Sequence, residues 1–172
     1  KEIRGHSFNL SEKLASVTFS EGIEIIGKNS FFYCSSLKCS IEFPESLLEI
    51  GDYAFFFCSE VTSIKFGSKV CYLGANCFEG CKSIEGALNL PNEITEIDDY
   101  TFSKCQKVTN VVFGQKIKRI GLQSFYLCES LAGDLVIPES VTEIGSYAFY
   151  QCEKLSSLQL SSKLTDLGAG AF

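Results

Sequence analysis

Nine cysteines and a single histidine are the residues of this chain with the most obvious capacity for chemistry. Six cysteines recur at a nearly constant spacing: Cys34, Cys58, Cys81, Cys105, Cys128 and Cys152. This regularity favours a ladder of buried, reduced thiols that act as small apolar core residues. Disulfide bonds between neighbouring copies are one alternative. Zinc bound near Cys71, Cys77 and Cys81 is the other, although zinc requires four converging ligands.

The sequence gives little support for catalysis. His6 is the only histidine, and it lies in an incomplete first copy of the repeat described below. A Ser-His-Asp or Cys-His arrangement requires a histidine held in a formed site. Acidic residues are plentiful, but their spacing does not indicate a pair of carboxylates in a cleft. We therefore expect no enzyme, no catalytic residue, and no cofactor or metal ion.

Composition and charge narrow the classes of partner. Hydrophobic residues make up 45% of the 172 residues and charged residues 21%, which is typical of a folded protein. The formal net charge of -6 argues against a nucleic-acid partner, since nucleic-acid binding requires a basic face. No apolar run approaches the roughly 18 residues of a membrane-spanning helix. We expect no membrane insertion in this segment.

The elements that position these cysteines belong to a repeat that runs through the whole chain. Phenylalanine recurs at the same nearly constant interval, at positions 8, 31, 55, 78, 102, 125, 149 and 172. Such a strict period predicts a solenoid. Each copy contains an apolar-x-apolar pair, typical of a short strand, and a second apolar pair followed by glycine. We interpret the glycine as a turn residue with positive φ, followed by a 3₁₀ or single helical turn that carries the phenylalanine.

Longer and shorter copies alternate and differ by a single residue, so the complete unit is a pair of copies. Pro44, Pro91 and Pro138 recur once in each pair. Charges alternate as well, because Arg119 stands in the column between Glu96 and Glu143. This order predicts exposed ion pairs between Arg119 and both glutamates on the neighbouring copies.

The chain is one repeat domain, residues 1–172, of about seven copies. It opens and closes part-way through a copy, and neither end shows the polar cap that solenoids require. We expect it to be a fragment of a longer repeat protein.

The copy that ends in Ile144-Gly145-Ser146-Tyr147-Ala148-Phe149-Tyr150-Gln151-Cys152 resembles the BspA-like leucine-rich repeat, also called the Treponema pallidum type. The resemblance recurs in every copy and departs from the pattern at Arg4 and Ser11 in the first. It implies a right-handed, curved, β-dominated solenoid of the α/β horseshoe class, with a parallel sheet on its concave side. Proteins of this family are typically secreted or surface-exposed in bacteria and protozoan parasites, and are associated with adhesion to host proteins.

Any specific function is expected where the copies differ. The outward positions of the apolar-x-apolar strands provide the candidate partner contacts Glu42, Lys65, Asn89, Asn110, Val112, Asp134 and Val136. Val112 and Val136 are apolar where water is expected, which suggests a contact patch. The alternative is that valine simply favours strands. A second aromatic surface, around Phe32, Phe56 and Tyr150, is either a contact face or a cover over the core.

These observations predict an extracellular or cell-surface module that binds a protein ligand, with adhesion to host or matrix proteins as its role. An intracellular scaffold or regulatory interaction module is the alternative, which free thiols favour. Glycan binding is a further possibility, although the strands lack an exposed aromatic platform.

Overall fold

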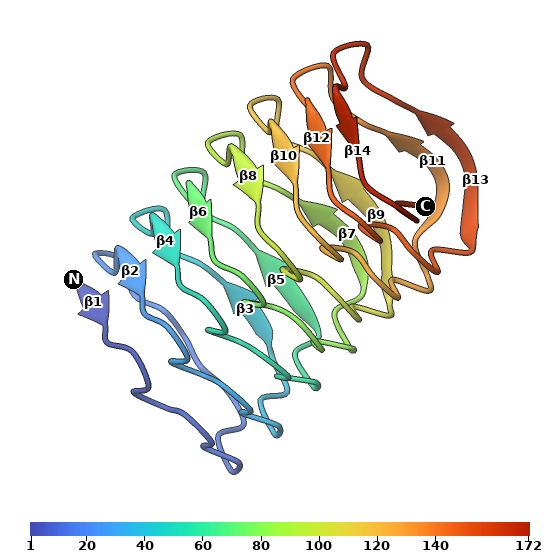
Figure 1. Ribbon diagram of the computed structural model, residues 1–172. Helices are drawn as coiled ribbons and strands as arrows, with labels where there is room; N and C mark the ends of the chain where they lie inside the picture. The colour runs from blue at the N-terminus through green and yellow to red at the C-terminus, as the bar shows by residue number, and fades with distance from the viewer.

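The computed structural model describes all 172 residues as a single coil of parallel β-structure with about seven turns. Successive copies stack as rungs, and the two termini lie at opposite ends of the stack (Figure 1). Strands lie along two sides of the coil, and the core lies between them. The solenoid predicted from the repeat is therefore confirmed.

One side carries the longer strands, which we call the long-strand face. Its strands are β3 (Ser40–Glu42), β5 (Ser63–Lys65), β7 (Gly86–Asn89), β9 (Val108–Val112), β11 (Ala132–Val136) and β13 (Lys154–Gln159). They pair in parallel as three separate ladders: β3 with β5, β7 with β9, and β11 with β13. The sheet expected at the apolar-x-apolar pairs is thus present, but it is interrupted after every second rung.

The other side carries strands of two residues each, which we call the short-strand face. Its strands are β1 (Glu2–Ile3), β2 (Ile25–Ile26), β4 (Glu49–Ile50), β6 (Tyr72–Leu73), β8 (Glu96–Ile97), β10 (Arg119–Ile120), β12 (Glu143–Ile144) and β14 (Asp166–Leu167). They form two parallel four-stranded ladders, with a break between β6 and β8.

The phenylalanine column fills the core between the faces. Phe31, Phe55, Phe78, Phe102, Phe125 and Phe149 are all at most 1% exposed. Consecutive rings stack nearly parallel, with centroids 4.9 to 5.7 Å apart from Phe8 to Phe172. Because every rung contributes one ring, the column forms a continuous aromatic stack along the coil.

The segments between the glycine and the cysteine are chains of β-turns, so the predicted 3₁₀ or helical turns are not found. In one rung, Ala54 N–H donates to Gly51 O and Phe56 N–H donates to Tyr53 O. The intervening amides of Tyr53 and Phe55 donate to the next rung. The structure contains no helix, and so offers no basis for assignment to the α/β horseshoe class.

The glycine column is needed for close backbone approach, not for the positive φ that we predicted. Gly27, Gly51, Gly74, Gly121, Gly145 and Gly168 all lack positive φ. A Cβ at Gly145 would lie 2.6 Å from Leu122 N on the preceding rung. Positive φ falls instead two and six residues later, as at Tyr53 and Phe57. Positive φ at the third residue of a four-residue turn is the geometry of a type II turn.

Asp98, the internal exception in the glycine column, coincides with the break in the short-strand ladders. It follows β8, and β8 is the strand that fails to pair with β6. A side chain at this column needs space that the close rung-to-rung approach does not leave, so we attribute the break to Asp98. Arg4 holds the same position in the first rung of the structure, and β1 pairs normally with β2.

Two of the three longer copies show a register shift beside their long strand. The register of β7 against β9 shifts between Gly86 and Ala87, and that of β11 against β13 shifts between Gly133 and Asp134. Gly86 and Gly133 have φ of 82° and 78°. These two longer copies therefore combine a left-handed glycine with a local irregularity of the ladder, whereas β3, in the first longer copy, pairs with β5 without a shift.

Replacing Gly145 by alanine is expected to destabilise the protein by about 3 kcal/mol, because the added Cβ overpacks the backbone of the preceding rung. Gly133 is the matched control. Nothing lies within 4 Å of a Cβ built there, so Gly133→Ala meets only the strain of positive φ, about 1 kcal/mol. Urea unfolding of both variants measures the difference. Equal losses would show that close approach is not what the glycine column provides.

Candidate functional site

The cysteine column is part of the core and not a reactive site. All nine cysteines are free thiols, and the six of the column are buried. Each column thiol donates a hydrogen bond to the carbonyl oxygen of the phenylalanine one rung earlier, over 3.0 to 3.4 Å. These bonds fix the Sγ atoms toward backbone oxygens, which supports the reduced ladder over disulfide bonds.

Burial keeps the column thiols beyond Cys34 protonated, whereas a hydrogen bond with Cys58 lowers the pKa of Cys34. Burial raises the pKa of Cys152 to about 12 and raises the pKa of Cys105 and Cys128 well above the ordinary range. The thiolate is the nucleophilic and metal-binding form, so Cys105, Cys128 and Cys152 are inert at neutral pH. Zinc binding near Cys71, Cys77 and Cys81 is also disfavoured, because Cys71 is exposed whereas Cys77 and Cys81 are buried. Nowhere do three or more His, Cys, Asp or Glu side chains gather as a metal ion would require.

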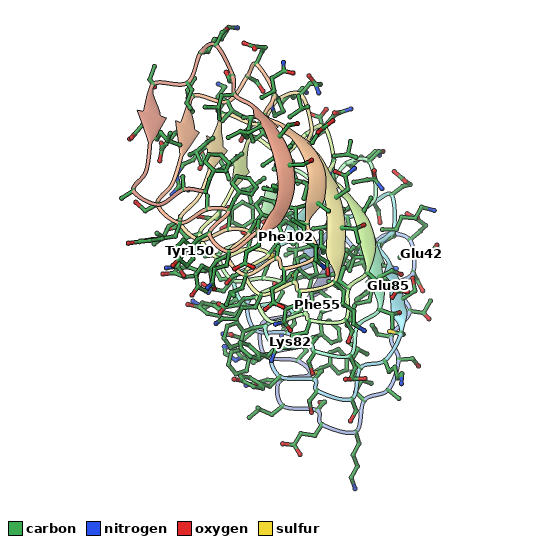
Figure 2. All side chains as sticks on the ribbon, turned by 90° about the vertical axis from the view of Figure 1, so that its right-hand side faces the viewer. Glu42, Phe55, Lys82, Glu85, Phe102 and Tyr150 are labelled. Carbon is green, nitrogen blue, oxygen red and sulfur yellow. The ribbon has the colours of Figure 1, made fainter.

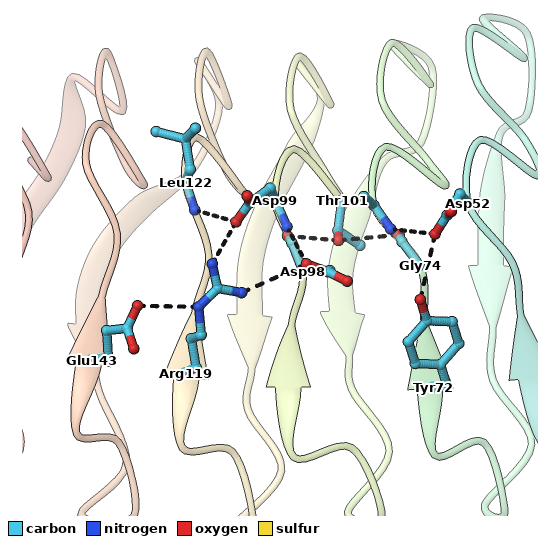
Figure 3. A network of polar contacts seen from close by, with 10 residues as sticks. Asp52, Tyr72, Gly74, Asp98, Asp99, Thr101, Arg119, Leu122 and Glu143 are labelled. Atoms are coloured by element: carbon cyan, nitrogen blue, oxygen red, sulfur yellow. Dashed lines mark hydrogen bonds and ion pairs between the residues drawn. The ribbon is translucent and has the colours of Figure 1, made fainter.

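Arg119 is held on the short-strand face by three carboxylates (Figure 3). Its Nε lies 3.1 Å from Glu143 Oε1, and its Nη2 lies 2.7 Å from Asp99 Oδ1. Asp98 is more distant, with Oδ1 3.6 Å from Nη1. The predicted pair with Glu143 is confirmed. The predicted pair with Glu96 is wrong, because the guanidinium turns toward the loop after β8 instead.

These contacts hold the Arg119 side chain in place between rungs of the solenoid. Burial opposes its charge, but hydrogen bonds to Asp99 and Glu143 outweigh that effect and raise the pKa of the guanidinium. Asp99 Oδ1 also accepts the N–H of Leu122 on the next rung. The carboxylates therefore connect rungs and do not leave the guanidinium free to hold an anion.

The candidate contacts lie on the long-strand face, on the opposite side of the molecule from the turns that carry Tyr150 (Figure 2). Four of them line one groove of about 460 Å³ that runs across β9 and β11: Asn110, Val112, Asp134 and Val136. Glu42 and Lys65 line a second groove of about 330 Å³ across β3 and β5. Asn89 pairs with Val112 in the β7–β9 ladder and lines neither groove.

The β9–β11 groove combines exposed apolar surface with polar groups. Val112 is 48% exposed and Val136 is 53% exposed. Gln115, Glu139 and Gln159 also line it. Gln115 and Glu139 are not among the predicted contacts, because they follow the strands and do not lie on them. A Pro-Glu pair occurs at equivalent positions as Pro44-Glu45 and Pro138-Glu139, and it could have signalled Glu139.

The second aromatic surface covers the turns and does not form an open platform. Phe32 stacks on Phe56 with centroids 5.0 Å apart, and Tyr33 stacks on Phe57 at 5.3 Å. These rings face one another along the stack, so their flat faces are largely occupied. Near the other end of the coil Tyr126 stacks on Tyr150 at 5.8 Å. This stacking supports the interpretation that the aromatics cover the core.

A polar pair separates the two aromatic groups. Glu79 Oε1 lies 2.7 Å from Lys104 Nζ, and that nitrogen also lies 5.6 Å from the centroid of Phe57. Glu79 Oε2 accepts a hydrogen bond from Asn76 Nδ2 at 2.6 Å. The charges of Glu79 and Lys104 are therefore satisfied within the turns.

Comparison with known proteins assigns the family. The model of the "BspA type Leucine rich repeat region" matches in six copies, over residues 1–132 and 86–172. The chain belongs to the BspA-type leucine-rich repeat family. The predicted resemblance is thus confirmed. No curated protein matches the chain.

Three solved structures share the fold of this BspA-type chain. A leucine-rich repeat protein from T. pallidum is 24% identical with a TM-score of 0.66, covering 97% of this chain and 66% of its own. One from Bacteroides ovatus is 26% identical with a TM-score of 0.76, covering 100% and 49%. One from Eubacterium ventriosum is 21% identical with a TM-score of 0.63, covering 92% and 50%. The chain therefore spans half to two thirds of the length of these relatives. None of its segments is a helix that could cross a lipid bilayer.

Proposed function

We propose that this BspA-type repeat domain binds a protein ligand through its long-strand face, as an adhesion module outside the cell or at its surface. The observation that carries the proposal is the β9–β11 groove, where Val112 and Val136 expose apolar surface among polar side chains. Small apolar areas bordered by polar groups are the usual composition of a protein contact. Membership of the BspA-type family supports an adhesive role toward host or matrix proteins.

The scaffold columns contribute little that is distinctive to recognition, because they are nearly the same in each rung and mostly buried. The long-strand face differs from rung to rung, with Glu42 and Lys65 paired on β3 and β5 and valines on β9 and β11. A ligand can therefore be recognised by position along the coil. We infer binding and not catalysis, and no cofactor is part of the proposal.

An intracellular scaffold or regulatory interaction module is the second candidate function. The nine free thiols favour it, since disulfide bonds are usual in small secreted proteins and rare in the cytosol. Surface biotinylation of intact cells that produce the full-length protein separates the two. Labelling on intact cells supports adhesion, and labelling only after lysis supports the intracellular scaffold.

Replacing Val112 and Val136 together by serine is expected to weaken ligand binding at least tenfold without unfolding the domain. Each half-exposed valine loses about 1 kcal/mol of apolar burial in the complex. The measurement is affinity capture from host-cell or matrix extract, followed by titration of the captured protein. Leu48→Ser with Leu167→Ser is the matched control, since both leucines are exposed away from the long-strand face. Unchanged affinity in the valine variant would contradict the proposal.

A further inference from the structure

The β9–β11 groove lies over a seam in the long-strand face. Within a ladder the residue after the strand bonds to its neighbour: Leu90 N–H donates to Val112 O, and Ile137 N–H donates to Gln159 O, over 2.9 and 2.8 Å. The equivalent Phe113 N–H has no acceptor on β11 or elsewhere in the protein. Val111 N–H donates to Asn110 Oδ1 at 2.8 Å and not to a neighbouring strand.

A free main-chain donor therefore accompanies the apolar patch. Val111 and Phe113 both line the groove. A buried or half-buried N–H without a partner costs free energy, and an oxygen atom from a ligand can recover it. The apolar surface alone does not select between ligands, whereas a donor at the seam favours a ligand with a carbonyl oxygen to offer. An extended peptide backbone carries such oxygens at regular intervals.

The charge of the groove further restricts the class of ligand that it can bind. Its ionisable lining residues are Asp134 and Glu139, and neither lysine nor arginine lines it. Glu139 accepts hydrogen bonds from the hydroxyl and the N–H of Ser162, which lower the pKa of its carboxyl group. Asp134 Oδ1 accepts the hydroxyl of Ser157 at 2.5 Å. Both side chains are thus oriented by the next rung.

The equivalent groove at the other end is different, and the contrast is informative. There Glu21, Glu42 and Glu45 share the lining with Lys65, and no valine lines the groove. The β9–β11 groove is accordingly the one that combines carboxylates, no cationic lining residue and exposed valines.

We propose that the β9–β11 groove binds an extended peptide segment in which an aliphatic side chain stands next to lysine or arginine. The aliphatic side chain packs on Val112 and Val136, the cationic side chain pairs with Asp134 and Glu139, and a peptide carbonyl accepts the Phe113 N–H. This inference rests on the proposed function, since it specifies the ligand of the same face. An acidic segment is disfavoured because it meets two carboxylates and no cation.

The test uses three short, terminally blocked peptides with a fluorescent label and a common glycine-serine background. The first carries leucine flanked by lysines. The second replaces the lysines by glutamates, and the third replaces the leucine by serine. Fluorescence anisotropy with the intact domain is expected to show the lysine-leucine peptide binding at least tenfold more tightly than either of the others. Raising the salt concentration should weaken that binding, because exposed charge pairs are screened.

Variants locate the binding. Asp134→Asn with Glu139→Gln is expected to weaken the lysine-leucine peptide at least tenfold, and so is Val112→Ser with Val136→Ser. Glu45→Gln is the matched control with no effect, because Glu45 accepts hydrogen bonds from Ser68 in the way Glu139 does from Ser162, but in the other groove.

Three outcomes would overturn the inference: equal binding of all peptides, binding that survives both groove variants, or no binding of the lysine-leucine peptide. None of these changes the outcome of ligand capture with the valine variant. A protein ligand that still depends on Val112 and Val136 would leave the proposed function standing while this inference fails. If capture of the protein ligand did not depend on Val112 and Val136, both the proposed function and this inference would fail.

Discussion

Raising the pH above about 9 is expected to destabilise the protein steeply, by as much as about 8 kcal/mol per pH unit. The effect comes from six cysteines whose pKa is raised in the folded protein: Cys58, Cys77, Cys81, Cys105, Cys128 and Cys152. In the unfolded chain each thiol ionises near pH 8.5 and releases a proton. In the folded chain the thiols keep their protons. Alkali therefore favours the unfolded state.

The sign and the size follow from this difference in bound protons. Below about pH 8.5 the thiols are protonated in both states, so they cause no pH dependence. Between that value and the folded pKa, each thiol lowers the free energy of unfolding by about 1.4 kcal/mol per pH unit. Six thiols acting together give the upper limit stated above. The loss for Cys152 ends near pH 12, where its folded form also ionises.

Urea unfolding at a series of pH values between 7 and 11 measures this slope. Cys105→Ala is expected to reduce the slope by about 1.4 kcal/mol per pH unit, because one buried thiol is removed. Cys71→Ala is the matched control, since Cys71 is exposed and its removal should leave the slope unchanged. Thiol titration adds an independent check, with six or more groups reacting only after unfolding. A stability that is flat up to pH 10 would contradict the buried ladder.

Replacing Phe102 by alanine is expected to destabilise the protein by about 3–5 kcal/mol. Phe102 is fully buried and stacks on both Phe78 and Phe125, with centroids 5.7 and 5.5 Å away. The flanking rungs are tied together by main-chain hydrogen bonds and cannot close the cavity. The free-energy cost of the lost apolar burial and the cost of the cavity therefore add. Urea unfolding followed by far-ultraviolet circular dichroism measures the loss.

Phe8→Ala provides the comparison for Phe102→Ala. Phe8 occupies the same column but stacks on one side only, at 5.0 Å from Phe31, and is 40% exposed. A clearly smaller loss is expected there. If both substitutions cost the same, stability would not depend on continuous stacking of the rings, and the column would be less important than its burial indicates.

Much of the fold could be predicted from the sequence, because the repeat period shows which residues of successive rungs lie in the same column. The columns of Phe, Cys and glycine, and the outward positions of the strands, follow directly from the strict period of the copies. The physical role of the glycine could not be derived in the same way. Positive φ and close backbone approach both demand glycine, and only the distance between Gly145 and Leu122 on adjacent rungs distinguishes them.

The errors share a cause, which is that contacts between rungs depend on the path of each turn. Glu96 stands beside Arg119 in the column, but the guanidinium reaches Asp99 because the loop after β8 brings that carboxylate closer. Likewise, the family resemblance implied one parallel sheet, whereas the long-strand face is divided into three ladders, two of which have register shifts, at Gly86 and at Gly133. From the sequence, only the two neighbouring valines of the groove at the seam, Val112 and Val136, indicated a contact patch.

Amide hydrogen exchange with and without the captured protein ligand tests most directly whether the long-strand face is the binding surface. Binding is expected to slow exchange in β9, β11 and β13, and above all at the Phe113 amide, which has no acceptor in the free protein. Exchange in the short-strand ladders and in the turns around Phe56 and Tyr150 is expected to remain unchanged. Protection confined to those ladders or turns, with none on β9 or β11, would contradict the proposed binding face.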